Sequence, residues 1–262
     1  MKKFRTFIKL FAFIMILAGG TTFLQASADS ALKSALEGSW EMESYETGGK
    51  IVPVSGLVIF AKDYFSMIYI MTEKDKEKSG RGHAGSFSAD GDKLSFKVPW
   101  WVEYVDGKAM VVRDPVEVRA VFEVNENSLV IKFESGSIQK FKRSPQAAES
   151  SLSGAWQMIG YEGGGSTGQA TGQILFSGSS FILIYSMEQK DGTLAGRAHG
   201  GKYRIQEDAL TLEVPWTLQY VSGKGSATDR VSQRAAHFKL EDGTLSITYD
   251  NNKAVQKFKY LN

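Results

Sequence analysis

The stretch LEGSWEMESYE at residues 36–46 occurs again, slightly altered, as LSGAWQMIGYE at residues 152–162. Trp156 therefore follows Trp40 by 116 residues, and the same offset relates residues along most of the chain. A repeat of this length is the size of a domain, so the duplication predicts two similar domains rather than a solenoid. Further pairs at this offset are Gly56 and Gly172, Phe60 and Phe176, Tyr69 and Tyr185, Arg81 and Arg197, His83 and His199, and the VPW of 98–100 and 214–216.

Toward the end of each copy the alignment needs a slip of one residue. With that slip Arg119 pairs with Arg234, and QKFK at 139–142 pairs with QKFK at 256–259. The blurred register leaves two interpretations of these arginines open. They cover the end of a barrel as cations over an indole ring, or they point outward as surface charges.

Within each copy, short runs of alternating apolar and polar residues follow one another, broken by turn sequences such as ADGD and VDGK. This pattern is typical of antiparallel strands, and no stretch shows a clear helical period. About eight such strands in roughly 110 residues suit a small closed barrel, which leaves no free edge. We therefore expect an all-β protein of two tandem antiparallel β-barrels, over residues 36–144 and 152–262, joined by a linker over 145–151.

The first residues have the pattern of an export signal: the basic MKKFR, the apolar FIKLFAFIMILAGG, and then the small residues ASA. This order predicts a signal peptide over residues 1–28, with cleavage before Asp29. The apolar run is shorter than the roughly 20 residues that a membrane-spanning helix needs, which argues against an uncleaved anchor. We expect the mature protein to be periplasmic or secreted, with no stable membrane insertion.

Removal of the signal peptide changes the charge of the chain. It removes four of the 31 basic residues and no acidic residue, which leaves 27 against 29 and a net charge of −2. Without excess positive charge, the mature protein is not expected to bind nucleic acid. The chain has no cysteine, so neither a disulfide nor a lipidated cysteine is expected.

Alternate residues of a strand point to opposite faces, and comparison of the two copies indicates which face is inside. Around Tyr69 and Tyr185 one face is bulky and nearly unchanged, whereas the other face changes and accepts Glu188. The bulky face is therefore predicted to be inside. By the same test Leu94, Phe96, Val98, Trp100, Val102 and Tyr104 point inward, and Lys97, Trp101 and Glu103 point outward.

Two of the three histidines share one local pattern, Arg-x-His-x-Gly, in GRGHAGSF and GRAHGGKY. Alternation predicts that Arg81 and His83, like Arg197 and His199, point into the barrels. An inward arginine must be paired or hydrogen-bonded, because an unpaired buried charge is costly. One interpretation is a closed network, in which the arginine meets a carboxylate or backbone carbonyls and the histidine meets a tyrosine hydroxyl.

The other interpretation is a binding cavity. The guanidinium would bind an anionic head group, the imidazole would add a donor or acceptor, and the aromatic and methionine face would hold an apolar body. A small hydrophobic or amphipathic molecule is the expected partner. The predicted ligand-binding residues are Arg81, His83, Tyr69, Trp100 and Tyr104 in the first barrel, and Arg197, His199, Tyr185, Trp216 and Tyr220 in the second.

The same residues leave alternatives to ligand binding open. His83 with Tyr104 could move a proton in an isomerisation or cyclisation, so an enzyme is an alternative. A solid pair of barrels acting through its surface, with Trp101 as an exposed contact, is another. One inward histidine per copy, without cysteine or a nearby inward acid, falls short of a metal-ligand set, so we expect no metal and no cofactor. A single axial histidine on haem is the remaining cofactor alternative.

Two repeated features predict local structure. Trp40 and Trp156 open the first strand of each copy and are expected to close one end of each barrel. Pro99 and Pro215, in the repeated VPW, cannot donate a hydrogen bond to a strand ladder, so they predict an edge or a bulge. His237 has no counterpart in the first copy and is interpreted as incidental.

The G-x-W opening, GSW at 38–40 and GAW at 154–156, followed by a barrel-like series of strands, resembles the lipocalin superfamily. The likeness covers both copies and is closest to small bacterial lipocalin-like domains. It implies a closed barrel with the tryptophan packed at its closed end, and binding of small hydrophobic molecules. A few relatives in the superfamily are isomerases, cyclases or haem proteins. The second and third lipocalin motifs, the disulfide and the C-terminal helix are not found in this sequence.

Overall fold

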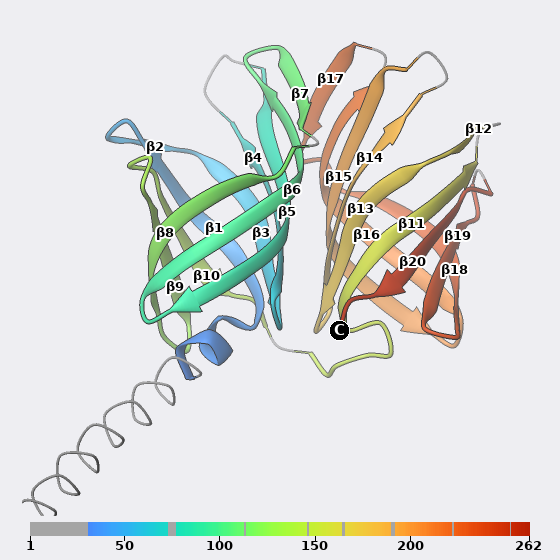
Figure 1. Ribbon diagram of the computed structural model, residues 1–262, viewed down its shortest axis with the longest axis horizontal. Helices are drawn as coiled ribbons and strands as arrows, with labels where there is room; N and C mark the ends of the chain where they lie inside the picture. The colour runs from blue at the N-terminus through green and yellow to red at the C-terminus, as the bar shows by residue number, and fades with distance from the viewer. Residues whose placement is uncertain are drawn as a thin grey trace, which may run out of the picture.

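The structure is a computed structural model that describes residues 31–72, 77–112, 114–145, 147–163, 166–189, 192–221, 223–251 and 253–262, with backbone alone for 166–168. The predicted signal peptide, residues 1–28, lies outside the described residues, as does Gln146 of the predicted linker. The described chain forms two closed antiparallel barrels of eight strands each, side by side (Figure 1). The predicted fold class is confirmed.

Barrel 1 closes because its last strand pairs with its first. Its strands are β1 Gly38–Thr47, β2 Lys50–Val52, β3 Val54–Ala61, β4 Tyr64–Met71, β5 Ser79–Asp90, β6 Lys93–Val105, β7 Lys108–Val112, β8 Val116–Val124, β9 Ser128–Phe133 and β10 Ile138–Arg143. Neighbouring strands follow the order β10-β9-β8-β6-β5-β4-β3-β1, and β1 pairs with β10 to complete the ring. The short strands β2 and β7 lie off this ring and pair with β1 and β6.

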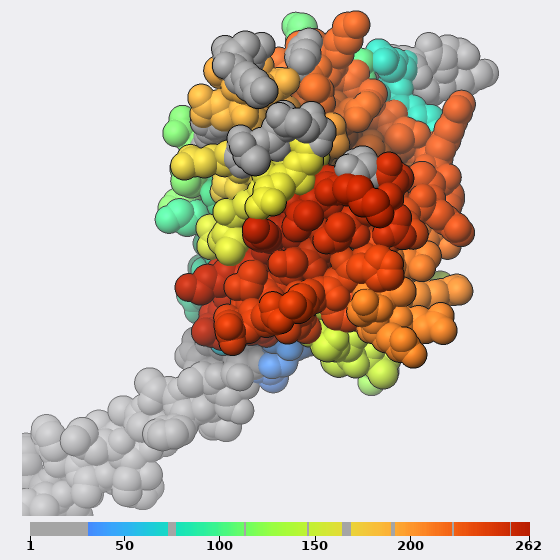
Figure 2. All heavy atoms as spheres, turned by 90° about the vertical axis from the view of Figure 1, so that its right-hand side faces the viewer, coloured from blue at the N-terminus to red at the C-terminus, as the bar shows by residue number. Residues whose placement is uncertain are grey.

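Barrel 2 repeats this topology strand for strand. Its strands are β11 Gly154–Gly163, β12 Ser166–Gly168, β13 Ala170–Ser177, β14 Ser180–Glu188, β15 Leu194–Gln206, β16 Ala209–Val221, β17 Lys224–Thr228, β18 Ser232–Glu241, β19 Thr244–Tyr249 and β20 Val255–Tyr260. The ring closes through β11 and β20, and β12 and β17 are the short additions. Figure 2 shows the outer face of this barrel, where β18, β19 and β20 lie on the side away from barrel 1.

The one-residue difference between the copies lies in the final hairpin. Strands β9 and β19 still begin 116 residues apart, at Ser128 and Thr244. The last strands begin 117 residues apart, at Ile138 and Val255. The extra residue of barrel 2 therefore follows β19. This confirms the predicted pairing of the two QKFK segments, whereas the predicted pairing of Arg119 with Arg234 is wrong.

A bulge in β6 reverses the faces to which the following side chains of this long strand point. Val98 and Pro99 together stand opposite Gly85 of β5, where a Cβ atom would lie 2.0 Å from a backbone oxygen of β6. The extra residue shifts the alternation, so Val98 and Trp101 both point into the barrel while Trp100 points out. The same bulge occurs in β16, which confirms the bulge predicted from the repeated proline.

Beyond this bulge, the predicted side-chain orientations of β6 are wrong. Trp100, Val102 and Tyr104 point away from the interior and pack against barrel 2. Trp101 lines the interior, and Glu103 bonds to an inward arginine. Simple alternation carried across an inserted residue assigns every following side chain to the opposite face.

The barrels join through the outward faces of β3–β6 and β13–β16, which form a buried apolar interface (Figure 1). Two tryptophans hold it with matching hydrogen bonds. Trp100 Nε1 donates to Thr171 Oγ1 at 3.1 Å, and Trp216 Nε1 donates to Ser55 Oγ at 3.1 Å. Each donor and acceptor in one bond is the 116-residue counterpart of those in the other.

Glycines of the Arg-x-His strands let the two backbones approach closely at this interface. A Cβ atom on Gly80 would lie 2.5 Å from Leu218 Cδ2, and one on Gly200 would lie 2.5 Å from Ile68 Cγ2. Side chains larger than hydrogen do not fit at these distances without movement. One face of the repeated motif therefore serves domain packing, and only the other face looks into the barrel.

The tryptophans of the G-x-W openings are buried at one end of each barrel, as expected. The indole N–H of Trp40 donates to Leu36 O, and that of Trp156 donates to Leu152 O, both at 2.8 Å. In barrel 1 a short helix over 31–36 covers this end (Figure 1). The helix carbonyl thus satisfies the buried indole donor.

The cation over the Trp40 ring is Arg143, at 3.9 Å from the ring centroid. Its guanidinium also donates to the carbonyl oxygens of Ala35, Glu37 and Glu126, at 2.7 to 2.9 Å. This residue was not anticipated from the sequence. Arg119, which the sequence offered as a possible cation over this ring, lies exposed on β8 instead.

Candidate functional site

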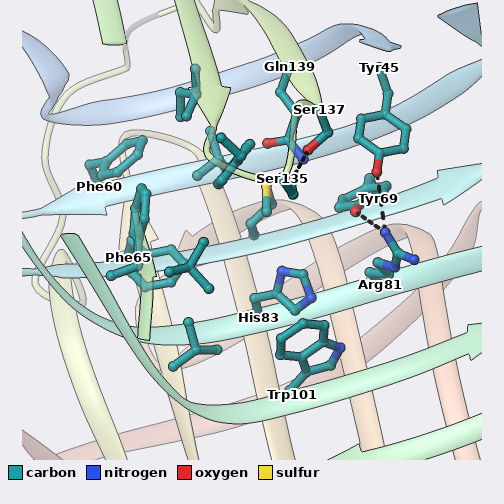
Figure 3. A pocket seen from close by; sticks show the side chains of 17 residues that line it. Tyr45, Phe60, Phe65, Tyr69, Arg81, His83, Trp101, Ser135, Ser137 and Gln139 are labelled. Atoms are coloured by element: carbon teal, nitrogen blue, oxygen red, sulfur yellow. Dashed lines mark hydrogen bonds between the residues drawn. The ribbon is translucent and has the colours of Figure 1, made fainter. Parts of the chain in front are cut away.

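Barrel 1 contains a partly open cavity of about 160 Å³ (Figure 3). Most of its wall is apolar, and the apolar residues come from five strands, β3, β4, β6, β8 and β9. Its polar groups are Tyr45, Tyr69, Arg81, His83, Ser135, Ser137 and Gln139. The apolar lining consists of Val58, Phe60, Phe65, Met67, Phe96, Val98, Trp101, Val118, Ile131 and Phe133.

A network of hydrogen bonds holds Arg81 at one side of the cavity. Its Nε donates to Glu103 Oε2 at 2.9 Å, and Trp101 Nε1 donates to the same oxygen at 3.1 Å. Its Nη1 lies 3.3 Å from the Tyr45 hydroxyl and 3.5 Å from the Tyr69 hydroxyl (Figure 3). Burial favours the neutral guanidine, but Tyr69 and then Glu103 and Tyr45 outweigh it and raise the pKa of Arg81. The ion pair leaves this part of the site without net charge.

Arg81 also marks the passage from the cavity to the open end of the barrel. A second pocket of about 360 Å³ shares Tyr45, Arg81, Ser135 and Ser137 with the cavity. Its remaining lining includes Glu77 and other polar residues. A molecule with an apolar body inside the barrel could therefore extend a polar part past Arg81.

His83 presents an unused hydrogen-bonding atom in the cavity. Its ring packs edge-on against Trp101, with centroids 4.3 Å apart, and its Nε2 is buried without a hydrogen-bond partner. Burial, and then the charge of Arg81, lower the pKa of His83 to about 3. The imidazole is therefore neutral at physiological pH, and its orphaned nitrogen is available to a hydroxyl or carbonyl of a ligand.

The structure brings together three of the five residues predicted for the first barrel. Tyr69, Arg81 and His83 line one cavity. Trp100 and Tyr104 lie in the barrel interface instead, for the reason given by the bulge. Trp101, Glu103 and Tyr45, which contact Arg81 or His83, were missed. The repeated VPW was the signal that could have identified Trp101 and Glu103.

In the second barrel the predicted residues separate in the same way. Arg197 and Tyr185 line a pocket of about 240 Å³, and His199 is buried beside it. Trp216 lies in the barrel interface. Tyr220 is two residues from the interface residue Leu218 on the same strand, so alternation places it on that outward face.

Barrel 2 has a second inward arginine, which the sequence alignment misplaced. Arg234 pairs across the strands with Leu212, just as Val118 pairs with Phe96 in barrel 1. The counterpart of Arg234 is therefore Val118 and not Arg119. Its Nη2 lies 3.4 Å from His199 Nδ1. A guanidinium thus occupies space that an apolar side chain lines in barrel 1.

Comparison with known proteins gives no match: no protein-family model, no curated protein sequence and no solved structure is significantly similar to the chain. Among the described residues, no three histidine, cysteine, aspartate or glutamate side chains gather as a metal site would require. None of the helices within the described ranges has the length and apolar character needed to cross a membrane.

Proposed function

We propose that the protein is an exported, lipocalin-like binding protein that holds a small hydrophobic or amphipathic molecule inside barrel 1. The observation that carries the proposal is a largely apolar cavity whose wall includes two residues with a buried polar atom that has no partner, His83 Nε2 and Gln139 Oε1. Buried polar groups in folded proteins almost always have a partner. A ligand hydroxyl or carbonyl would supply the partner that the chain does not.

The cavity volume limits the size of the apolar part. An engineered apolar cavity of about 150 Å³ in another protein binds benzene. The 160 Å³ cavity of barrel 1 is therefore large enough for roughly one aromatic ring or a short branched alkyl group. A longer ligand would continue past Arg81 into the outer pocket.

The charges of the site favour an uncharged head group. Arg81 is already paired with Glu103, so an added carboxylate would meet both the guanidinium and the opposing acid. Burying a further charge beside a satisfied ion pair costs free energy without a matching gain. We therefore propose an alcohol, phenol, ketone or similar neutral ligand.

Proton-transfer catalysis is less well supported. A general base works best when its pKa lies near the working pH, whereas the pKa of His83 is lowered to about 3. Tyr104, its proposed partner, lies outside the barrel. The surface-module alternative loses its first candidate contact as well, since Trp101 lines the cavity.

Isothermal titration calorimetry with benzyl alcohol and benzoate tests the proposal on the two-barrel protein. Benzyl alcohol should bind with a dissociation constant below about 1 mM, which is within reach of a ligand of this size. Benzoate, which has the same ring and a carboxylate, should bind at least tenfold more weakly. The absence of any saturable binding of benzyl alcohol, or tighter binding of benzoate, would contradict the proposal.

A matched pair of variants on β8 locates the site. Val118→Phe fills the cavity and should weaken benzyl alcohol binding at least tenfold, whereas Val121→Phe adds the same ring at an exposed position and should leave binding unchanged. Equal effects of the two substitutions would place the probe elsewhere.

Export is tested separately, by determining the N-terminal residue of the protein recovered outside the cytoplasm. This residue should be Asp29.

A further inference from the structure

Barrel 2 has a polar pocket in place of the apolar cavity of barrel 1. The pocket has a volume of about 240 Å³, and its wall includes Arg197, Arg234, Tyr161, Tyr185 and Tyr249. No acidic residue belongs to the described lining. Two guanidiniums and three phenols therefore surround one small space.

The two barrels differ in charge at equivalent positions. In barrel 1, Arg81 stands across from Glu103 on the neighbouring strand, and the pair is neutral. In barrel 2, Arg197 stands across from Gln219, so the compensating acid is missing. Arg234 replaces an apolar residue and adds a second positive charge. The interior of barrel 2 thus carries a charge of +2 where barrel 1 carries none.

The hydrogen bonds of both guanidiniums are incomplete. Arg197 Nε is buried without any partner. Arg234 makes only long contacts to the ring of His199, at 3.4 and 3.5 Å, and no carboxylate pairs with either arginine within the described part of the chain. Both arginines are half-buried, and a partly desolvated guanidinium without a counterion is unfavourable, so an anion from solution would stabilise the pocket.

The side chains around the two arginines remain uncharged, so none of them neutralises a guanidinium. Burial, and then the charges of Arg234 and Arg197, hold the pKa of His199 well below its ordinary value. Burial raises the pKa values of Tyr185 and Tyr249, although the nearby arginines oppose this. Both phenols therefore keep their protons: Tyr249 donates a hydrogen bond to Gln256 Oε1 at 3.0 Å, and Tyr185 can donate one to a ligand oxygen.

We propose that barrel 2 binds a small oxyanion, a carboxylate or phosphate group, between Arg197 and Arg234. Guanidiniums bind such groups through paired, charge-assisted hydrogen bonds, and tyrosine hydroxyls complete the shell. The two barrels then have different ligands: a neutral apolar molecule in barrel 1 and a small polar anion in barrel 2. This assignment stands independently of the ligand proposed for barrel 1.

Calorimetric titration with inorganic phosphate and with malonate, at constant ionic strength, tests this site in the full two-barrel protein. At least one anion should bind saturably with a stoichiometry of one, and the tighter of the two identifies the head group. Constant ionic strength removes general screening from the comparison. Failure of both anions to bind below about 10 mM would overturn the proposal.

Variants that recreate barrel 1 provide the second test. Arg234→Val restores the residue type of Val118, and Gln219→Glu restores the acid of barrel 1 at an exposed position. Each should weaken anion binding at least tenfold. Arg119→Val removes the same charge from the exposed surface of β8 and should leave the affinity within about twofold.

The outcomes separate the site from general charge effects. Equal losses in Arg119→Val and Arg234→Val, or unchanged affinity in Gln219→Glu, would refute the pocket. If Arg234→Val does not fold, the Gln219→Glu result decides alone. Benzyl alcohol binding in barrel 1 should be the same in all three variants, so failure of the barrel 1 proposal would leave this test intact.

Discussion

Acidification should destabilise the protein through His83. This side chain has a folded-state pKa of about 3, whereas a histidine in an unfolded chain titrates near about 6.5. Folding therefore keeps the ring neutral where the unfolded chain binds a proton. The stability associated with the neutral ring is complete above pH 6.5 and is lost progressively as the pH falls toward 3.

The size of this effect follows from the difference between the two pKa values. At pH 5 the solution is 1.5 units below the unfolded pKa, and each unit corresponds to about 1.36 kcal/mol, so His83 should cost about 2 kcal/mol relative to pH 8. The titration of His199 acts in the same direction, because burial and two arginines lower its pKa. The variant His83→Gln carries no titrating ring and should lose its share of this pH dependence.

Urea unfolding at pH 8 and pH 5 measures the difference, followed by tryptophan fluorescence. The free energy of unfolding should fall by about 2 kcal/mol less in His83→Gln than in the unmodified protein. His237→Gln is the matched control, since that ring is exposed on the surface of barrel 2. A pH dependence that is the same in His83→Gln and in the unmodified protein, within about 0.5 kcal/mol, would refute the buried neutral state.

Three further substitutions test the packing. Gly200→Val places a side chain within 2.5 Å of Ile68 and should separate the barrels at a cost of about 1 to 3 kcal/mol, seen as an increased radius of gyration in small-angle scattering. Arg143→Ala removes the cation over Trp40 and three hydrogen bonds to carbonyls, and should lower the stability of barrel 1 by about 2 to 4 kcal/mol in calorimetry. Trp100→Phe should lower the free energy of unfolding by about 1 kcal/mol through one lost hydrogen bond, and benzyl alcohol binding should be unchanged. Weaker binding of benzyl alcohol would mean that Trp100 belongs to the binding site.

The fold could be predicted because the duplication and the strand alternation are local features of the sequence. Two copies that share an inward face indicate the barrel interior without any knowledge of its shape. The same comparison placed Tyr69, Arg81 and His83 together, and the structure agrees. Residues before the bulge follow strict alternation, so their orientation could be inferred directly.

The remaining site residues depend on where the alternation breaks. The bulge at Pro99 was expected, but how many residues stand opposite Gly85 depends on the pairing of two strands. That single extra residue decides whether Trp100 or Trp101 faces the cavity. Similarly, the position of Arg234 depends on pairing between β16 and β18, which no local pattern indicates.

The joining of the barrels could not be inferred because the outward faces were interpreted as solvent-exposed. Ile68, Ile70 and Ile184 are apolar residues on those faces, and all three are fully buried between the barrels. The counterpart of Ile70 is Ser186, and this change from an apolar to a polar residue suggested that the face is exposed to solvent. In the structure, the variation reflects packing against a second barrel.

The matching tryptophan hydrogen bonds indicate how this protein arose. Trp100 meets Thr171 as Trp216 meets Ser55, and such exchange of equivalent partners is the isologous arrangement of a two-fold homodimer. An ancestral chain with one barrel would have buried this face against a second copy of itself. After fusion of the two subunits in one polypeptide, their sequences could diverge independently. Each barrel interior could then acquire its own side chains while the interface between the barrels was kept.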